Sequence, residues 1–179
     1  MRSPSTSDSF RESRDSFRSR HSDAAVSERR VVTWRSFSSA SGMTTLAIVD
    51  AGPLYAAADA DDDDHAASRA ALSRSDLRLV IPALVVAEAA YFVGRRLGSP
   101  AESAFLRGIG TLDVEAPTSE DFNRMADLVI EYGDFPLGGT DASVIALAER
   151  LSARIVVTLD RRHFGAVRPA HTEAFELLP

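Results

Sequence analysis

The sequence predicts an α/β fold with three layers, in which helices flank a central, mostly parallel sheet of about five strands. The main observation is an alternation that begins near residue 43: short runs of β-branched and other apolar residues are separated by longer segments with helical spacing. Such alternation is typical of βαβ units, whose helices cross over between parallel strands. The second observation is the length of 179 residues, which suits one folded domain.

The expected elements follow one another without internal repeats. Proline and glycine mark several boundaries: Pro82 ends the second strand, Gly98 closes the long apolar helix, and Gly133 stops the helix that Thr118 caps. Strands are expected at 45–49, 77–81, 111–114 and 155–158, with a short edge strand at 175–178. Helices are expected at 66–72, 83–97, 100–107, 119–132 and 141–151.

Residues 1–42 differ in composition from the rest of the chain, and we predict that they are disordered. They contain 13 serines and 8 arginines, few large apolar residues and no helical or strand period. Met43 directly precedes the first strand and is the expected true start, so that the folded domain spans 43–179. Two alternatives are an arginine- and serine-rich arm that contacts RNA and a transit-like segment, although its acids argue against the latter.

Missing residue types exclude several classes of protein. Cysteine is absent, so disulfides, thiolate metal sites and thiol nucleophiles are excluded. Lysine is also absent, which excludes receiver domains and haloacid-dehalogenase-type phosphatases, since both place a lysine beside aspartates at strand ends. No apolar run approaches the roughly 20 residues that a membrane span requires. We therefore expect a cytoplasmic protein that does not contact the membrane.

Charge is distributed unevenly along the chain. Residues 1–42 hold eight arginines against five acids, so the net charge of −6 for the whole chain leaves −9 for residues 43–179. An acidic domain is unusual for a nucleic-acid-binding protein. If the domain cleaves RNA, metal ions and local arginines must offset the repulsion of phosphates.

Four isolated acids stand at positions where four different elements would bring them together. Two aspartates directly follow expected strands, one opens an expected helix, and a glutamate lies within the long apolar helix. Like charges repel, so gathering carboxylates costs free energy unless a hard divalent cation binds them through oxygen. The pattern indicates a metal-dependent enzyme that acts on phosphate esters. The four candidates are Asp50, Glu88, Asp141 and Asp160.

Each acid also has a purely structural interpretation. The aspartates can begin turns or cap helices, and at the start of a helix they complement its dipole. Glu88 is harder to explain, because Val85 and Phe92 share its helix face and an ionised carboxylate is costly there. Its structural alternatives are an ion pair with Arg95 or Arg96 and a path to solvent.

The four acids in this order, separated by 38, 53 and 19 residues, resemble the PIN domain and specifically the VapC toxins of bacterial toxin–antitoxin pairs. The resemblance covers about residues 44–179 and is weak between 99 and 130. Each stretch alone has low specificity, whereas the ordered set on one α/β framework is specific. The matching stretches are 48-IVDAGPL-54, 82-PALVVAEAAYFV-93, 137-LGGTDASVIALAERL-151 and 158-TLDRRHF-164.

The resemblance implies a PIN-like fold, a homodimer and a metal-dependent endoribonuclease that a cognate VapB-like antitoxin holds inactive. It implies Asp50, Glu88, Asp141 and Asp160 as catalytic carboxylates of one site for Mg²⁺, with Mn²⁺ as the alternative ion. One departure concerns the first aspartate. Many relatives have a serine or threonine within two positions of it, where this chain has alanine and glycine, so a hydroxyl contact is expected to be missing.

Other residues near the four acids are weaker candidates. Among the histidines His163 lies nearest in sequence to one of the four candidate acids, and no histidine pair has the spacing of metal ligands. The acidic run 59–64 lacks the spacing of a calcium loop and is expected to be a solvated helix start. Arginines beside the acids are expected to meet RNA phosphates or an acidic antitoxin segment, with a structural role at helix ends as the alternative. These are Arg95, Arg96, Arg161 and Arg162.

Two other functions compete with a toxin ribonuclease. One is a PIN-like nuclease that acts on structured DNA or on ribosomal RNA processing intermediates outside any toxin system. The other is a binding module that keeps the acids but acts only by sequestering a partner.

Overall fold

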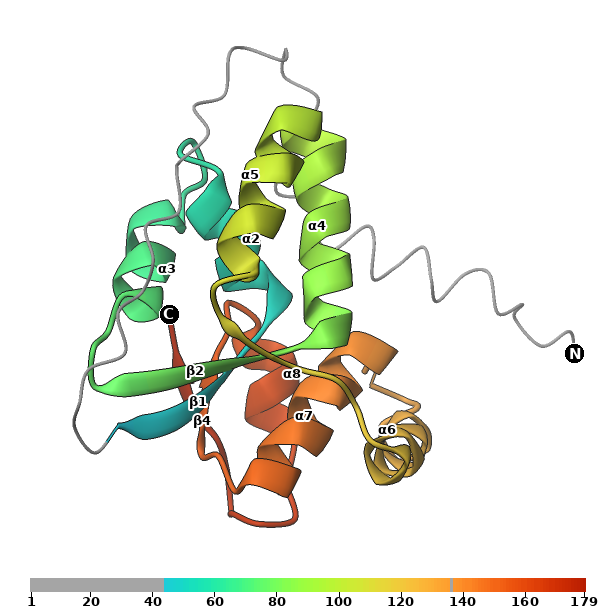
Figure 1. Ribbon diagram of the computed structural model, residues 1–179. Helices are drawn as coiled ribbons and strands as arrows, with labels where there is room; N and C mark the ends of the chain where they lie inside the picture. The colour runs from blue at the N-terminus through green and yellow to red at the C-terminus, as the bar shows by residue number, and fades with distance from the viewer. Residues whose placement is uncertain (1–43, 136) are drawn as a thin grey trace, which may run out of the picture.

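The computed structural model describes residues 44–135 and 137–179, and the expectations for 1–42 and Met43 fall outside this range. Five parallel strands form the central sheet in the order β3-β2-β1-β4-β5, as the sequence predicts (Figure 1). They are β1 Thr45–Val49, β2 Leu77–Pro82, β3 Asp113–Glu115, β4 Ile155–Val157 and β5 Glu176–Leu178.

The strand order places a topological switch point at the centre of the sheet. From β1 the chain proceeds to β2 and β3 on one side, then returns to β4 and β5 on the other. In open α/β sheets, ligands bind outside the carboxyl ends of the strands at such a point. Here β1 and β4 are paired to their last residues, because Val49 lies opposite Val157. Whatever follows these two strands must therefore lie close together.

Seven helices are present in the described part of the chain: α2 Ala51–Ala58, α3 His65–Leu72, α4 Ala83–Leu97, α5 Ser99–Ile109, α6 Ser119–Glu131, α7 Gly139–Leu151 and α8 Arg161–Ala166. Two of them, α2 and α8, were not among the expected elements. The α2 helix has no amphipathic period because seven of its eight residues are buried. The α8 helix has only six residues, too few to produce a period.

The core lies on both sides of β1. The three apolar residues at the end of that strand are fully buried, which is typical of a strand covered on both faces. The α7 helix is buried from Ala142 to Ala148, since it lies between the sheet, α4 and α6. The α4 helix turns its stripe of Val85, Ala89 and Val93 inward, at the spacing of one helix face.

The α4 and α5 helices lie side by side at one end of the molecule (Figure 1). Gly98 joins them with φ 86°, a conformation that glycine adopts without strain. On α6, Thr118 and Asp121 form the expected capping box. None of the described helices combines the length and apolar character needed to cross a bilayer.

Candidate active site

Asp50 directly follows β1 and caps α2. Its side chain is 7% exposed, and its two oxygens each accept a hydrogen bond. The Ala51 amide donates to Oδ1 at 2.7 Å, and the Thr158 hydroxyl donates to Oδ2 at 2.8 Å. The expectation that Asp50 lacks a hydroxyl contact is therefore wrong. The hydroxyl comes from the end of β4, 108 residues away, because β1 and β4 are neighbours in the sheet.

Asp160 occupies the matching place after β4, where it caps α8. His163 contacts both of its oxygens: the main-chain amide donates to Oδ1 at 2.9 Å, and ring Nδ1 lies 2.5 Å from Oδ2. The Asp160 amide donates to the Thr158 hydroxyl at 2.9 Å. Thr158 is fully buried and so joins the two strand-end aspartates. Sequence reasoning missed it, although a threonine two residues before the last acid was a visible signal.

Asp141 lies in the first turn of α7, two residues later in the helix than expected. Gly138 is the N-cap, and its amide donates to Asp141 Oδ2 at 3.1 Å. Asp141 therefore has the position and the hydrogen bond of a helix-capping acid, which is the structural alternative that the sequence left open. Its other oxygen accepts no hydrogen bond from a described residue.

Glu88 lies in the second turn of α4, at the border of the buried stripe. Val85 beside it is fully buried, whereas Phe92 is only partly buried. The expected alternative of an ion pair with Arg95 or Arg96 is not found: within 44–135 and 137–179, Glu88 makes no hydrogen bond or ion pair. Its half-buried carboxylate is therefore the least constrained of the four.

The charges of other candidate acids act on two of the four, Asp50 and Asp141. The pKa of Asp50 is raised to about 7, chiefly by burial and also by the negative charges of Asp141 and Glu88, against the opposing hydrogen bonds from Thr158 and Ala51. The pKa of Asp141 is raised to about 6, chiefly by burial and to a lesser extent by the charges of Glu88 and Asp160. The Gly138 amide and the charge of His163 oppose it. The site thus disfavours negative charge in the absence of a cation.

The donor set fits a hard divalent cation, because all four candidates offer carboxylate oxygens. A cation would also reverse the repulsion that raises the pKa of Asp50 and Asp141. Across the described ranges, no three acidic or histidine side chains lie close enough to form a ready-made metal cage. Mg²⁺ usually keeps several waters and rarely uses an all-protein cage, so such a spread of carboxylates suits it.

Arg96 has a structural place between α2 and α4. Its guanidinium carbon lies 5.4 Å from the centre of the Tyr55 ring and 5.7 Å from that of Phe92. Cation–π contacts of this kind hold the two helices together. Of the four arginines predicted to contact RNA or an antitoxin, Arg96 therefore fits that prediction least well.

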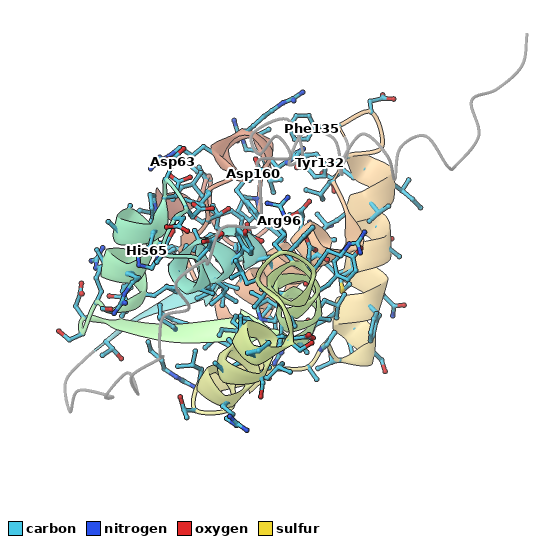
Figure 2. All side chains as sticks on the ribbon, turned by 90° about the horizontal axis from the view of Figure 1, so that it is seen from above. Asp63, His65, Arg96, Tyr132, Phe135 and Asp160 are labelled. Carbon is cyan, nitrogen blue, oxygen red and sulfur yellow. The ribbon has the colours of Figure 1, made fainter. Side chains whose placement is uncertain are left out.

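The other three arginines, Arg95, Arg161 and Arg162, are exposed. The Arg162 guanidinium carbon lies 5.6 Å from the centre of the Phe135 ring, which also packs in a T-shaped pair with the His163 ring at a centroid distance of 4.9 Å. Figure 2 shows Phe135 and Asp160 in the same part of the molecule. Arg161 and Arg162 begin α8, directly after Asp160, and are thus positioned beside the acids.

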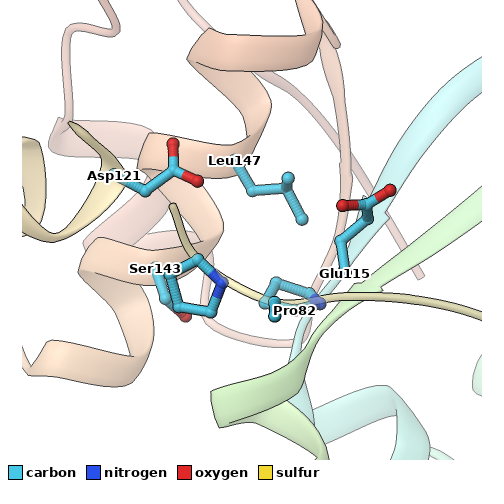
Figure 3. A pocket seen from close by; sticks show the side chains of 7 residues that line it. Pro82, Glu115, Asp121, Ser143 and Leu147 are labelled. Carbon is cyan, nitrogen blue, oxygen red and sulfur yellow. The ribbon is translucent and has the colours of Figure 1, made fainter. Parts of the chain in front are cut away.

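A small pocket lies near the ends of β2 and β3, beside α6 and α7 (Figure 3). Its volume is about 10 Å³, room for about one water. None of the four candidate acids lines it. Its walls are Pro82, Glu115, Ala116, Pro117, Asp121, Ser143 and Leu147.

Comparison with known proteins gives a consistent result. The PIN-domain family model matches residues 47–168. The chain is 37% identical over 134 residues to ribonuclease VapC26 of Mycobacterium tuberculosis, which covers 74% of this chain and 99% of the relative.

Two solved structures share the fold. One is M. tuberculosis VapC20, described as a sarcin–ricin-loop-cleaving toxin, with a TM-score of 0.63 and 18% identity over 71% of this chain and 98% of that one. The other is VapBC2 of Rickettsia felis bound to a DNA fragment of its promoter, with a TM-score of 0.57 and 16% identity over 75% of this chain and 100% of that one. At such identities the likeness concerns the fold alone.

Proposed function

This chain belongs to the PIN-domain family and groups with its VapC ribonucleases, and on that premise we propose a divalent-metal-dependent endoribonuclease that is the toxin of a type II toxin–antitoxin pair. The observation that carries the proposal is that burial, together with the charges of neighbouring acids among the four, raises the pKa values of Asp50 and Asp141. Helix capping alone explains why an aspartate follows a strand. It does not explain why Glu88 from a fourth segment faces the same buried charges.

We assign Asp50, Glu88 and Asp141 as direct ligands of Mg²⁺ or Mn²⁺, with Asp160 acting through water. When bound, such an ion supplies Lewis-acid chemistry and lowers the pKa of a bound water. The protein residues orient the ligands. Each Asp50 oxygen uses one lone pair for its hydrogen bond and keeps another for metal. Asp141 is held through one oxygen and presents the other.

RNA is the proposed substrate, in a cytoplasmic setting, and the exposed Arg95, Arg161 and Arg162 are its proposed phosphate contacts. The same arginines suit an acidic segment of a VapB-like antitoxin that covers the site. If they contact RNA, replacing Arg161 and Arg162 by glutamine weakens RNA binding and lowers its dependence on salt. Unchanged RNA binding by that double variant contradicts the assignment.

A homodimer is the proposed assembly. Tyr91 on α4 and Leu106 on α5 are 52% and 46% exposed, which supports a further interface on this helix pair. Light scattering at tens of micromolar decides the point, and a monomer contradicts it. We also propose that residues 43–179 form the whole PIN domain. A chain that begins at Met43 then melts at the temperature of the full chain, and a loss of several degrees contradicts this.

The central test is Asp141→Asn, which keeps the shape of the side chain and an oxygen that can accept the Gly138 hydrogen bond. Activity is measured on RNA with Mg²⁺ or Mn²⁺ and with a chelator, alongside metal-free melting. We expect severe loss of cleavage and a melting temperature that stays equal or rises, because a buried charge is removed. Asp127→Asn, at an exposed position of α6, is the matched control.

Two results would contradict the assignment. If Asp141→Asn unfolds the protein, Asp141 serves as a helix cap. If the variant cleaves RNA as well as the unchanged chain does, Asp141 has no catalytic role. A protein that binds RNA or antitoxin but cleaves nothing with either ion is instead the binding module.

A further inference from the structure

His163 is a histidine for which the proposed mechanism has no use, yet it makes two hydrogen bonds to one of the four acids. Its amide and its ring Nδ1 bond the two oxygens of Asp160. Its charge also acts on Asp141, so the ring lies close to a second acid. One residue thus determines the orientation of one carboxylate and faces another.

The ring is not explained by packing alone. It packs at a steep angle against the Phe135 ring, a contact that a phenylalanine at position 163 would also make. Nε2, however, is buried without a hydrogen-bond partner among the described residues. A buried ring nitrogen without a partner costs free energy, and a purely apolar side chain would avoid that cost. The imidazole is therefore favoured by what Nδ1 does.

We propose that His163 is a positioning residue of the metal site, whose Nδ1–H donates to Asp160 Oδ2 and fixes the carboxylate that reaches the metal through a water. A carboxylate only accepts hydrogen bonds, so Nδ1 carries the proton of the pair. The proposal rests on the function proposed above. Asp50 is held in a different way, because two separate residues, Ala51 after β1 and Thr158 after β4, each donate a hydrogen bond to one of its oxygens.

Fixation of this type has a known scale. Residues that hydrogen-bond the ligands of a metal, without touching it, contribute about 10–100-fold to metal affinity or activity. In Asp160 the amide bond to Oδ1 is a main-chain contact that substitutions at 163 leave in place. Only the bond to Oδ2 depends on the side chain, which makes it separable by mutation.

Two substitutions separate the hydrogen-bond donor of the imidazole from the packing of its ring. His163→Asn places an amide nitrogen near the position of Nδ1 and removes most of the ring. His163→Phe keeps a ring against Phe135 and removes the donor. Mn²⁺ affinity is measured by electron paramagnetic resonance of free Mn²⁺, independently of RNA cleavage, after circular dichroism confirms that each variant is folded. His65→Phe, at the start of α3, is the matched control, since it also removes a ring Nδ1 hydrogen bond, here to the Ala56 carbonyl and not to one of the four acids.

If the donor positions Asp160, His163→Phe weakens Mn²⁺ binding by about 10–100-fold and His163→Asn weakens it much less. If only packing matters, the order reverses, and the proposal is overturned. Equal losses in the two variants, or no loss in either, also overturn it. Should His163→Phe fail to fold, His163→Leu replaces it under the same criteria.

A double-mutant cycle tests whether His163 acts through Asp160. In the Asp160→Asn background, His163→Phe should cause no further loss of Mn²⁺ affinity, because the group that it positions is gone. Additive losses would show that His163 acts by another route. The unchanged chain separates the two proposals: if it binds no Mn²⁺, the metal site itself fails, whereas normal binding with an additive cycle rejects only the role of His163.

Discussion

Two strand-to-helix corners of the sheet each place an aspartate at a helix cap, and they differ in their surroundings. At one, Asp50 follows β1 and caps α2; at the other, Asp160 follows β4 and caps α8. Both acids accept a main-chain hydrogen bond from the helix they begin. The Asp50 corner is buried, and seven of the eight residues of the α2 helix that follows it are buried too. The Asp160 side chain, by contrast, is 39% exposed.

The difference shows that helix capping is determined by local sequence, whereas the charge state of the carboxyl group is determined by the tertiary fold. Capping is local: an aspartate after a strand finds the amides of the next turn wherever it lies. Charge depends on depth in the fold and on the neighbours. Asp50 lies at the central strand next to Asp141 and Glu88, so burial and repulsion raise its pKa. The same residue type at the same kind of turn therefore acquires different chemistry.

Thr158 is the link between the two corners, and breaking it has the largest expected effect. Thr158→Val keeps the shape but leaves Asp50 Oδ2 without its donor and the Asp160 amide without its acceptor. We expect RNA cleavage to fall by about 10–100-fold. Buried polar groups without partners should also lower the free energy of unfolding by about 1–3 kcal/mol each.

Thr158→Ser is the control, since it retains the hydroxyl and loses only a methyl group. It should keep most of the activity that valine removes. The measurements are cleavage rates at saturating Mn²⁺ and urea unfolding of the metal-free protein. Equal activity of the valine and serine variants would mean that the two corners work independently.

Much of this arrangement was predictable from the sequence, for identifiable reasons. The apolar runs before Asp50 and Asp160 mark strand ends, and parallel strands bring their carboxyl ends to one edge. The capping box of Thr118 could be read from four adjacent residues. The lengths of β3 and α5 differed from expectation by a few residues, as element ends usually do.

The sequence did not reveal what depends on contacts between distant segments. The bond from Thr158 to Asp50 joins residues 108 positions apart, and only the pairing of β1 with β4 brings them together. The place of Arg96 over Tyr55 likewise requires that α2 and α4 pack together. The α2 helix was left out of the expected elements because burial on all sides removes the periodicity by which a helix is recognised.

The second prediction concerns pH and makes the two corners differ in a measurable way. The pKa of Asp50 rises from 3.8 in the unfolded chain to about 7 in the metal-free fold. Between these values the folded state binds more protons than the unfolded state, so stability falls as pH rises from about 4 to about 7. Above pH 7 the penalty is complete. Asp141, with its pKa raised to about 6, contributes in the same direction.

The metal-free protein should therefore melt at a higher temperature at pH 5.5 than at pH 8, apart from the background that other groups contribute. Asp50→Asn isolates the effect, because it cannot ionise. We expect it to stabilise the metal-free fold at pH 8, by an amount on the order of a few kcal/mol given about 1.4 kcal/mol per pKa unit. At pH 4 the gain should largely disappear, since Asp50 is already protonated there.

Melting curves of Asp50→Asn and of the exposed control Asp127→Asn, in chelator across pH 4 to 8, check this directly. A divalent cation should weaken the fall in stability above pH 6, because it binds the ionised carboxylates and competes with protons. If the gain in stability from Asp50→Asn is the same at pH 4 and pH 8, the fold does not raise the pKa of the Asp50 carboxyl group. The central corner would then be a helix cap like its counterpart, and the contrast between Asp50 and Asp160 would reduce to exposure alone.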